Sequence, residues 1–197
     1  MQSSAKHRGQ IENDAIYTAS DAILLGETWA MHADEINISG YKTVARVDCT
    51  RQARRACGAC YLLSQRLLSD VRDPAYIRIG ENEDWVDAAV LKLRHVLIAG
   101  AYANPRVTVG TIRSFLERCS AEEEPKLILG DFNHNIIEAA NSRFKETVEG
   151  FGLKIWNVNV PNENITLDLV VSNFSISHGT YVSLTSFRQP IWDRYDV

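Results

Sequence analysis

An apolar run that ends in Gly130-Asp131-Phe132-Asn133 constrains this chain more than any other stretch. Leu127-Ile128-Leu129 is typical of a buried strand, and side chains along an extended segment alternate between its two faces. We therefore expect Asp131 and Asn133 to point the same way and Phe132 to point the other. A paired carboxylate and carboxamide suit phosphoester chemistry, because the first can orient or deprotonate water and the second can hold a phosphate oxygen. The alternative is a polar turn, in which the same residue types are common.

A second acidic residue stands at the end of another apolar run. Ala22-Ile23-Leu24-Leu25 is followed by Gly26 and Glu27, so Glu27 comes where a buried strand should reach the surface. Two strands that each end in a carboxylate can build one shared site, because ligands commonly sit at strand ends and on loops. Mg²⁺ takes only one or two protein carboxylates and keeps several waters. Glu27 and Asp131 would therefore suffice for a magnesium site.

The rest of the chain mixes strand and helix patterns. Apolar residues recur every three or four positions within Thr108–Ser120, which predicts an amphipathic helix. Strand-rich halves with helices between them suit a two-layer sheet sandwich with helices packed outside. The other expected elements are helices at residues 9–20 and 136–149 and strands at 22–25, 85–93, 96–102, 126–129, 165–172 and 181–185.

Four short motifs follow one another along the chain: Leu25-Gly26-Glu27-Thr28-Trp29, Ala101-Tyr102-Ala103-Asn104-Pro105, Gly130-Asp131-Phe132-Asn133 and Thr166-Leu167-Asp168-Leu169-Val170. Their sequences and order resemble those of the endonuclease/exonuclease/phosphatase superfamily. Within it, the chain resembles the apurinic-type endonuclease domains of non-LTR retrotransposons and of helicase-encoding, Helitron-like transposons. The resemblance spans about residues 16 to 192. It implies an α+β fold, a four-layer α/β/β/α sandwich of two packed sheets flanked by helices.

The resemblance also implies a role for each residue that matches a family motif. Glu27 is then the principal ligand of Mg²⁺, or of Mn²⁺ in its place, which sits on the scissile phosphate. Asp131 activates or orients the attacking water, and Asn133 donates a hydrogen bond to phosphate. Tyr102 contacts the phosphate or supports the site, and Asp168 holds the catalytic His in one tautomer. The alternatives are an ordinary strand aromatic at Tyr102 and a solvent-facing carboxylate at Asp168.

The last motif of the family, Ser-Asp-His followed by any residue and Pro, is altered in this chain. Ser186-Phe187-Arg188-Gln189-Pro190 keeps the frame but has Phe187 at the Asp position and Arg188 at the His position. Arg188 can bind phosphate and can pair with Asp168. It stays protonated, so it cannot act as a general base. The loss of one general acid–base group typically costs about 10²- to 10⁴-fold in rate.

The start of the chain is the second departure. Family members open with a strand that ends in an Asn, whereas residues 1–10 contain no apolar run. We therefore expect a single domain over residues 1–197 that lacks the first strand, which would threaten both stability and the site. Together the two departures favour a decayed or mispredicted copy of a mobile-element endonuclease. A longer upstream reading frame that contains the strand and its Asn would count against that hypothesis.

Bulk properties narrow the setting. A net charge of −4 argues against a protein that coats nucleic acid by bulk charge, although Lys and Arg outnumber acidic residues within residues 42–78. No run resembles a membrane span or a secretory leader, so we expect a nuclear or cytoplasmic protein without a membrane partner. The 4 cysteines then fit reduced thiols. Cys57 and Cys60 have C-x-x-C spacing, but no second pair follows to complete a zinc site.

The favoured function is a Mg²⁺-dependent endonuclease that nicks DNA and leaves a 3′-hydroxyl, from a domain that was once part of a larger transposon polyprotein. One alternative is a phosphatase or RNA nuclease of the same superfamily. The other is a catalytically dead domain that at most binds nucleic acid, which Phe187, Arg188 and the absent strand favour.

Overall fold

The computed structural model describes residues 11–13, 15–49, 57–121, 123–135, 142–156 and 168–176, and the backbone alone at 15–16, 181–183 and 191–193. Residues 11–13 are helical. The further elements are α2 (Ala15–Ala19), β1 (Ala22–Gly26), β2 (Tyr41–Val47), β3 (Ala59–Ser64), a 3₁₀ helix (Gln65–Asp70), β4 (Val71–Glu81), β5 (Asp84–Leu93), β6 (Val96–Ala103), α3 (Val109–Cys119), β7 (Lys126–Asp131), α4 (Ser142–Gly150), β8 (Lys154–Ile155), β9 (Asp168–Ser172), β10 (Tyr181–Ser183) and β11 (Ile191–Asp193).

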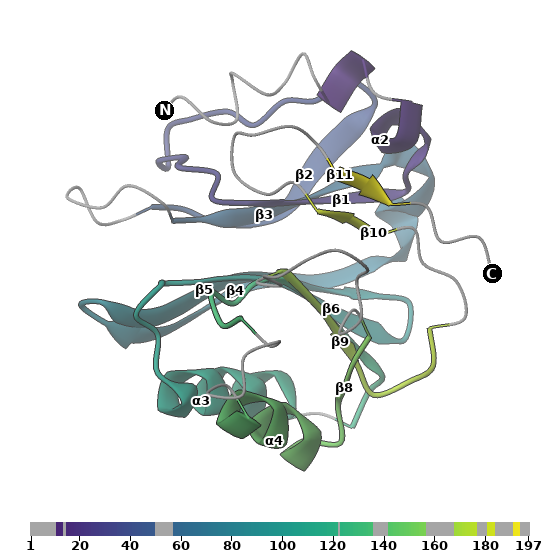
Figure 1. Ribbon diagram of the computed structural model, residues 1–197. Coiled ribbons are helices and arrows are strands. Elements are labelled where there is room, and N and C mark those ends of the chain that lie inside the picture. The colour runs from purple at the N-terminus through teal and green to yellow at the C-terminus, as the bar shows by residue number, and fades with distance from the viewer. Residues whose placement is uncertain are drawn as a thin grey trace.

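Two sheets stack face to face in the middle of the molecule. One has the order β1-β3-β2 and is antiparallel, and the other has the order β4-β5-β6-β7-β9-β8. Within the larger sheet β6 and β7 run parallel, and α3 supplies the crossover that a parallel pair requires. Figure 1 shows α3 and α4 against the outer face of this sheet and α2 on the far side of the smaller one. This arrangement confirms the predicted α/β/β/α sandwich.

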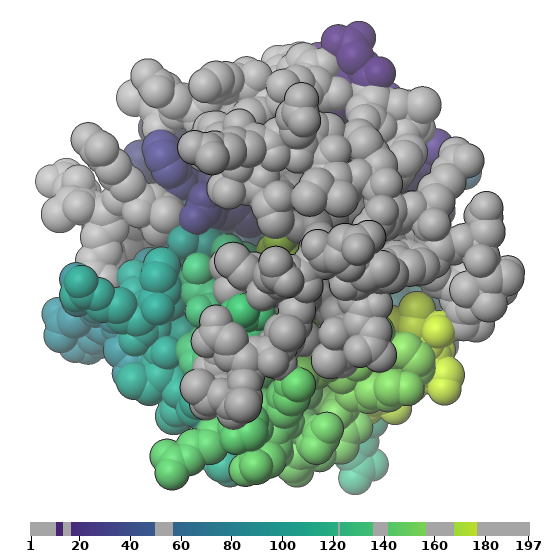
Figure 2. Space-filling view, in the orientation of Figure 1, coloured from purple at the N-terminus to yellow at the C-terminus, as the bar shows by residue number. Residues whose placement is uncertain are grey.

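Each interface between layers has its own apolar core. The largest lies between the six-stranded sheet and the helices α3 and α4, and includes Ile112, Phe115, Ile128 and Phe144. Residues of alternate strand positions face the other sheet, as β3 and β5 show in the cluster between the sheets. Figure 2 shows the teal and green residues of the larger sheet and its helices in the lower half of this face. Both faces of β3 are covered, which explains why its residues are almost uniformly buried.

The predicted helix at Thr108–Ser120 is confirmed as α3. Its buried side chains recur at three- and four-residue spacing, on the face that contacts the sheet. Thr108 is the N-cap, and its hydroxyl accepts a hydrogen bond from the backbone N–H of Thr111. The Asp84 carboxylate in turn accepts from the N–H of Thr108 at 2.8 Å. The cap thus ties the start of α3 to the start of β5.

Several predicted strands are confirmed and others were missed. β1, β5, β6 and β7 match the expected segments to within one or two residues, and the turn at Arg94 joins β5 to β6. The described parts of the last predicted helix and of the strand predicted at 165–172 are α4, from Ser142, and β9, from Asp168. The expected starts of both elements lie outside the described residues. β4 was not predicted, since five consecutive exposed residues hide any alternation. Residues 1–10 also lie outside the described part, so the missing first strand stays a prediction.

The prediction of four reduced thiols is wrong in this structure, because Cys49 and Cys57 form a disulfide. Cys49 follows β2 and Cys57 precedes β3, and these antiparallel neighbours bring the two Cα atoms to 5.4 Å. Cys60 and Cys119 are free and buried. Cys57 packs beside Tyr102, whereas Cys60 faces the opposite side of β3, so the C-x-x-C spacing does not form a pair.

No helix among the described residues is long and apolar enough to cross a membrane.

Candidate functional site

A row of polar side chains crosses the six-stranded sheet near one end. Asp87 of β5 is the register partner of Tyr102 in β6, Tyr102 is the partner of Asp131 in β7, and Asp131 is the partner of Asp168 in β9. Register partners point to the same side of a sheet. This side faces the smaller sheet, because Ala89, two residues from Asp87, packs between the sheets. Four strands therefore deliver their side chains to one edge of the gap between the sheets.

Glu27 reaches the same row from the smaller sheet. It directly follows β1 and has a left-handed backbone conformation, with φ 47°. The next two residues are fixed to the segment before β3, since the N–H of Thr28 donates to Gly58 O at 3.3 Å and that of Trp29 to Cys57 O at 3.0 Å. The Glu27 side chain is hydrogen-bonded to Tyr102. Glu27 and Tyr102, each at the end of a predicted strand, thus meet across the gap between the sheets.

Tyr102 is held as a neutral phenol. Its ring is 1% exposed and packs against Trp85, with the ring centroids 5.8 Å apart. Burial raises the pKa of Tyr102 well above its ordinary value, and the neighbouring Glu27 carboxylate raises it further. The hydroxyl therefore keeps its proton and acts as a hydrogen-bond donor. This environment argues against the alternative of an ordinary strand aromatic.

The expected alternation through Asp131, Phe132 and Asn133 is wrong. β7 ends at Asp131, and Asn133 has φ 52°, so the segment is a turn in which the N–H of Asn133 donates to Asp131 Oδ1 at 2.8 Å. Asn133 Nδ2 donates to Ala103 O at 2.7 Å, and its side chain is also hydrogen-bonded to Tyr102. Phe132 does point away, into the core beside α3 and α4. The turn, rather than the strand, sets Asn133 beside Asp131.

Gly130 makes this turn possible. Its φ is +144°, and a Cβ at this position would lie 1.9 Å from the backbone oxygen of Ala101 in the neighbouring strand. Only glycine fits such an approach. Each residue of the motif thus has its own place: Gly130 allows the close approach to Ala101, Phe132 packs in the core, and Asp131 and Asn133 present a carboxylate and a carboxamide to the site.

Three carboxylates converge on the site, and the other two raise the cost of ionising Asp131. Burial raises the pKa of Asp131 to about 7, and the charges of Asp168 and then Glu27 add to the rise, although the Asn133 N–H opposes it. Mg²⁺ and Mn²⁺ prefer such oxygen donors, and Mg²⁺ takes only one or two carboxylates. Across the described ranges no group of three or more His, Cys, Asp or Glu residues has a metal-binding arrangement. Neighbouring carboxylate oxygens are the type of donor that a hydrated Mg²⁺ or Mn²⁺ takes.

Phe187 and Arg188 lie outside the described residues. His134 is described, and its Nδ1 lies 3.1 Å from Phe132 O while its ring packs on Phe144 of α4, with centroids 5.2 Å apart. Phe144 belongs to the core on the helix side of the sheet. His134 therefore does not stand in for the missing histidine.

Sequence reasoning missed one charged pair in the row. Arg78 of β4 donates from Nε to Asp87 Oδ1 at 2.8 Å, and the two residues are register partners. The Asp87 side chain is only 7% exposed. An aspartate within the otherwise apolar Trp85–Leu91 run was the signal that could have revealed it, because a buried carboxylate requires a partner.

The surface of residues 42–78, in which Lys and Arg outnumber the acids, is only partly described. Three of its four described arginines are ion-paired, Arg78 with Asp87 among them, whereas Arg72 donates to the backbone oxygens of Ser69 and Val71. Arg46 pairs with Asp48 and Arg66 with Asp21. Arg51, Arg54 and Arg55 lie outside the described residues. A phosphate-facing basic patch in this part of the chain stays a prediction.

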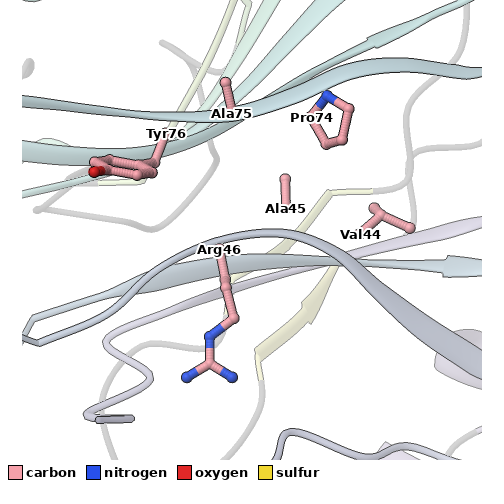
Figure 3. Close-up of a pocket in the computed structure, with 6 residues that line it drawn as sticks. All are labelled: Val44, Ala45, Arg46, Pro74, Ala75 and Tyr76. Carbon is pink, nitrogen blue, oxygen red and sulfur yellow. The ribbon is translucent and has the colours of Figure 1, made fainter. Parts of the chain in front are cut away.

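A cavity of about 160 Å³ opens elsewhere, between β2 and β4. In Figure 3 the guanidinium of Arg46 points away from the proline and alanine across the cavity, and it donates to Asp48 and to the backbone of Asp34. None of the carboxylates of the row lines this space, which is formed by Val44, Ala45, Arg46, Pro74, Ala75 and Tyr76. It is therefore separate from the candidate site.

Neither models of protein families nor curated proteins match this sequence. Solved structures do match: an endonuclease/exonuclease/phosphatase family protein from Bacteroides thetaiotaomicron is 10% identical, with a TM-score of 0.57, and the match covers 97% of this chain and 85% of that one. This chain has the endonuclease/exonuclease/phosphatase fold.

Nucleases and phosphatases both occur among the structures that share this fold. The endonuclease domain of TRAS1, a telomere-specific non-LTR retrotransposon, is 15% identical with a TM-score of 0.56, and the match covers 90% of this chain and 85% of that one. A mannosyl-6-phosphatase of Bacteroides thetaiotaomicron VPI-5482 is 11% identical with a TM-score of 0.54, covering 93% and 85%. The resemblance seen in the four motifs is thus confirmed at the level of the fold, and both kinds of neighbour hydrolyse phosphoesters.

Proposed function

We propose that this chain is a divalent-metal-dependent phosphodiester hydrolase that nicks DNA. The observation that carries the proposal is the convergence of Glu27, Tyr102, Asp131, Asn133 and Asp168 at one end of the two sheets. These residues come from four strands that are far apart in sequence. A chance cluster of three carboxylates in a half-buried position would be unfavourable without a ligand that offsets their charge.

Each side chain has a distinct task in this proposal. Glu27 holds Mg²⁺ or Mn²⁺, next to the Asp131 carboxyl. When bound, this cation acts as a Lewis acid that offsets negative charge on the scissile phosphate. The Tyr102 hydroxyl and the Asn133 amide donate hydrogen bonds to phosphate oxygens. In the free protein the Tyr102 hydroxyl is hydrogen-bonded to Glu27, and the Asn133 amide to Ala103 O and Tyr102, so each donor exchanges a partner when phosphate binds.

Asp131 takes the proton of the attacking water in this proposal. A general base works best when its pKa lies near the pH of the reaction, and that of Asp131 is raised to about 7. Burial, and then the neighbouring charge of Asp168, keep the pKa of Asp131 high in the metal-free protein. Arg188, which stands at the usual His position, would contribute charge to phosphate binding and no proton transfer.

Two observations support DNA and a mobile-element origin over other phosphoesters. The sequence as a whole resembles transposon endonuclease domains, and the TRAS1 endonuclease domain is among the structures with this fold. We infer from the same resemblance that the domain once belonged to a larger transposon polyprotein. The mannosyl-6-phosphatase with this fold makes a small phosphomonoester the competing substrate.

A nicking assay on supercoiled plasmid with Mg²⁺ tests the proposal. The unaltered chain should nick and Glu27→Gln should not, whereas Glu35→Gln, at an exposed acid, serves as the matched control. If only Arg188→His nicks, the other site residues are competent and Arg188 has disarmed them. If no folded variant nicks but a small phosphomonoester is hydrolysed, the phosphatase alternative holds. If nothing is hydrolysed, the domain is an inactive relic.

A further inference from the structure

Arg78 connects the two sheets at the end where the candidate site lies. Its Nε donates to Asp87 Oδ1 at 2.8 Å within the larger sheet. Its Nη2 donates to the backbone oxygen of Asp48 at 2.6 Å, directly after β2 of the smaller sheet. The planar guanidinium presents donors in fixed directions, so one side chain can hold both partners at once. Arg78 is therefore a clamp between the sheets.

The contact on the smaller sheet continues to Glu27. Asp48 is followed by Cys49, whose N–H donates to Ala30 O at 2.9 Å. Ala30 lies three residues after Glu27. Between them, the backbone N–H of Trp29 donates a hydrogen bond to Cys57 O, and Cys57 is joined to Cys49 by the disulfide. Few degrees of freedom remain between Arg78 and the backbone that carries Glu27.

The contact on the larger sheet continues to Tyr102. Asp87 and Tyr102 are register partners, so their Cα atoms are fixed by the hydrogen bonds between β5 and β6. Tyr102 is hydrogen-bonded to Glu27. Arg78 is therefore connected to this pair by two routes, through Asp87 to Tyr102 in the larger sheet and through Asp48 to Glu27 in the smaller one.

We propose that Arg78 is a positioning residue, which fixes the spacing of the two sheets so that Glu27 and Tyr102 face the same phosphate. The role rests on the proposed function, because it concerns the geometry of that site. Arg78 itself need not touch substrate. Residues that orient a metal ligand indirectly typically change metal affinity by about 10- to 100-fold when replaced.

The test must remove the clamp without stranding a charge. Arg78→Met alone leaves the buried Asp87 carboxylate without its cation, which can unfold the protein. The double variant Arg78→Met/Asp87→Asn removes both charges together. Arg94→Met/Asp70→Asn is the matched control, since Arg94 Nε donates to Asp70 Oδ2 at 2.9 Å at the opposite end of the β4–β5 pair. Arg78→Lys keeps the charge but cannot hold both partners in the same geometry.

Two measurements are made on each folded variant. Hydrogen exchange reports on the amides of Thr28, Trp29 and Cys49. Their exchange rates should rise in the Arg78 double variant and stay the same in the control. The Mg²⁺ concentration at half-maximal nicking should rise about 10- to 100-fold, with Arg78→Lys in between. Binding of Mn²⁺ alone, followed by calorimetry, should weaken by the same factor.

Unchanged amide exchange in the double variant would overturn the clamp. Faster exchange with an unchanged Mg²⁺ requirement and Mn²⁺ affinity would overturn the positioning role and leave Arg78 as a purely structural residue. A failure of the proposed function looks different, because then the unaltered chain does not nick. In that case Mn²⁺ affinity decides the positioning role, and an unaltered chain that binds no Mn²⁺ overturns it.

Discussion

Asp131 and Asp168 stand opposite each other on neighbouring antiparallel strands, with their side chains on the same face of the sheet. Like charges in directly opposite positions destabilise a sheet. The pair is nonetheless half-buried, and Asp168 contributes to the raised pKa of Asp131. A fold that keeps two such residues side by side sacrifices stability at this point, which is typical of functional sites.

The Asp131 carboxyl should make the metal-free protein less stable as pH rises. Its pKa is about 7 in the folded chain and 3.8 as the ordinary value, so between these values the folded state binds a proton that the unfolded state has lost. The free energy of unfolding therefore falls as pH rises from about 4 to 7, by about 4 kcal/mol at most. Urea unfolding in EDTA at pH 5 and pH 8 measures the change.

Asp131→Asn should remove most of this pH dependence, while Asp73→Asn, at an exposed position, should keep it. The comparison isolates one carboxyl from the general titration of the protein. A slope that is the same in all three proteins would contradict the assignment of the proton to Asp131.

Gly130→Ala should destabilise the fold by about 3 kcal/mol, because the left-handed backbone and the oxygen of Ala101, 1.9 Å from the new Cβ, both oppose it. Gly150→Ala is the matched control, since nothing lies within 4 Å of a Cβ there. Chemical denaturation compares the two. An equal effect at both glycines would show that the close approach of β6 and β7 does not limit the residue at position 130.

Tyr102→Phe should lower the rate of DNA nicking by about 10²-fold and cost about 1–3 kcal/mol of stability, because the buried hydroxyl's hydrogen bonds to Glu27 and Asn133 are lost while the ring still packs on Trp85. Tyr76→Phe tests the same chemical change at an exposed tyrosine and should leave the rate unaltered. Steady-state nicking assays and thermal unfolding are the two measurements. If Tyr102→Phe nicks DNA at the full rate, the Tyr102 hydroxyl plays no part in the reaction.

The residues that end predicted strands could be found from the sequence, whereas the residues that depend on strand pairing could not. Glu27 and Asp131 each follow an apolar run, a pattern visible without a structure. Arg78 and Asp87 meet only because β4 pairs with β5 in one register. A one-residue shift of that register would turn Asp87 to the other face, and nothing local in the sequence fixes it.

Local backbone geometry accounts for the remaining differences. Asn133 was expected to share a face with Asp131 through strand alternation, and it does reach the site, but through a left-handed turn residue. The disulfide escaped prediction for a related reason: Cys49 and Cys57 become neighbours only after β2 and β3 pair. The number of cysteines and the expected cellular compartment say nothing about which cysteines lie next to each other in the fold.

The Cys49–Cys57 disulfide should stabilise both the fold and the site. Closing a loop between residues that are 8 apart removes entropy from the unfolded chain worth about 2–3 kcal/mol. Cys49 also packs against Tyr102 and donates to the segment after Glu27, so reduction should loosen that segment as well. Unfolding with and without a dithiol reductant measures the first effect, and the Mg²⁺ requirement for nicking measures the second. The double variant Cys49→Ser/Cys57→Ser should match the reduced protein and no longer respond to reductant. Cys60 and Cys119 are already free thiols, so a double variant that still responds to reductant would contradict the assignment of the response to this disulfide.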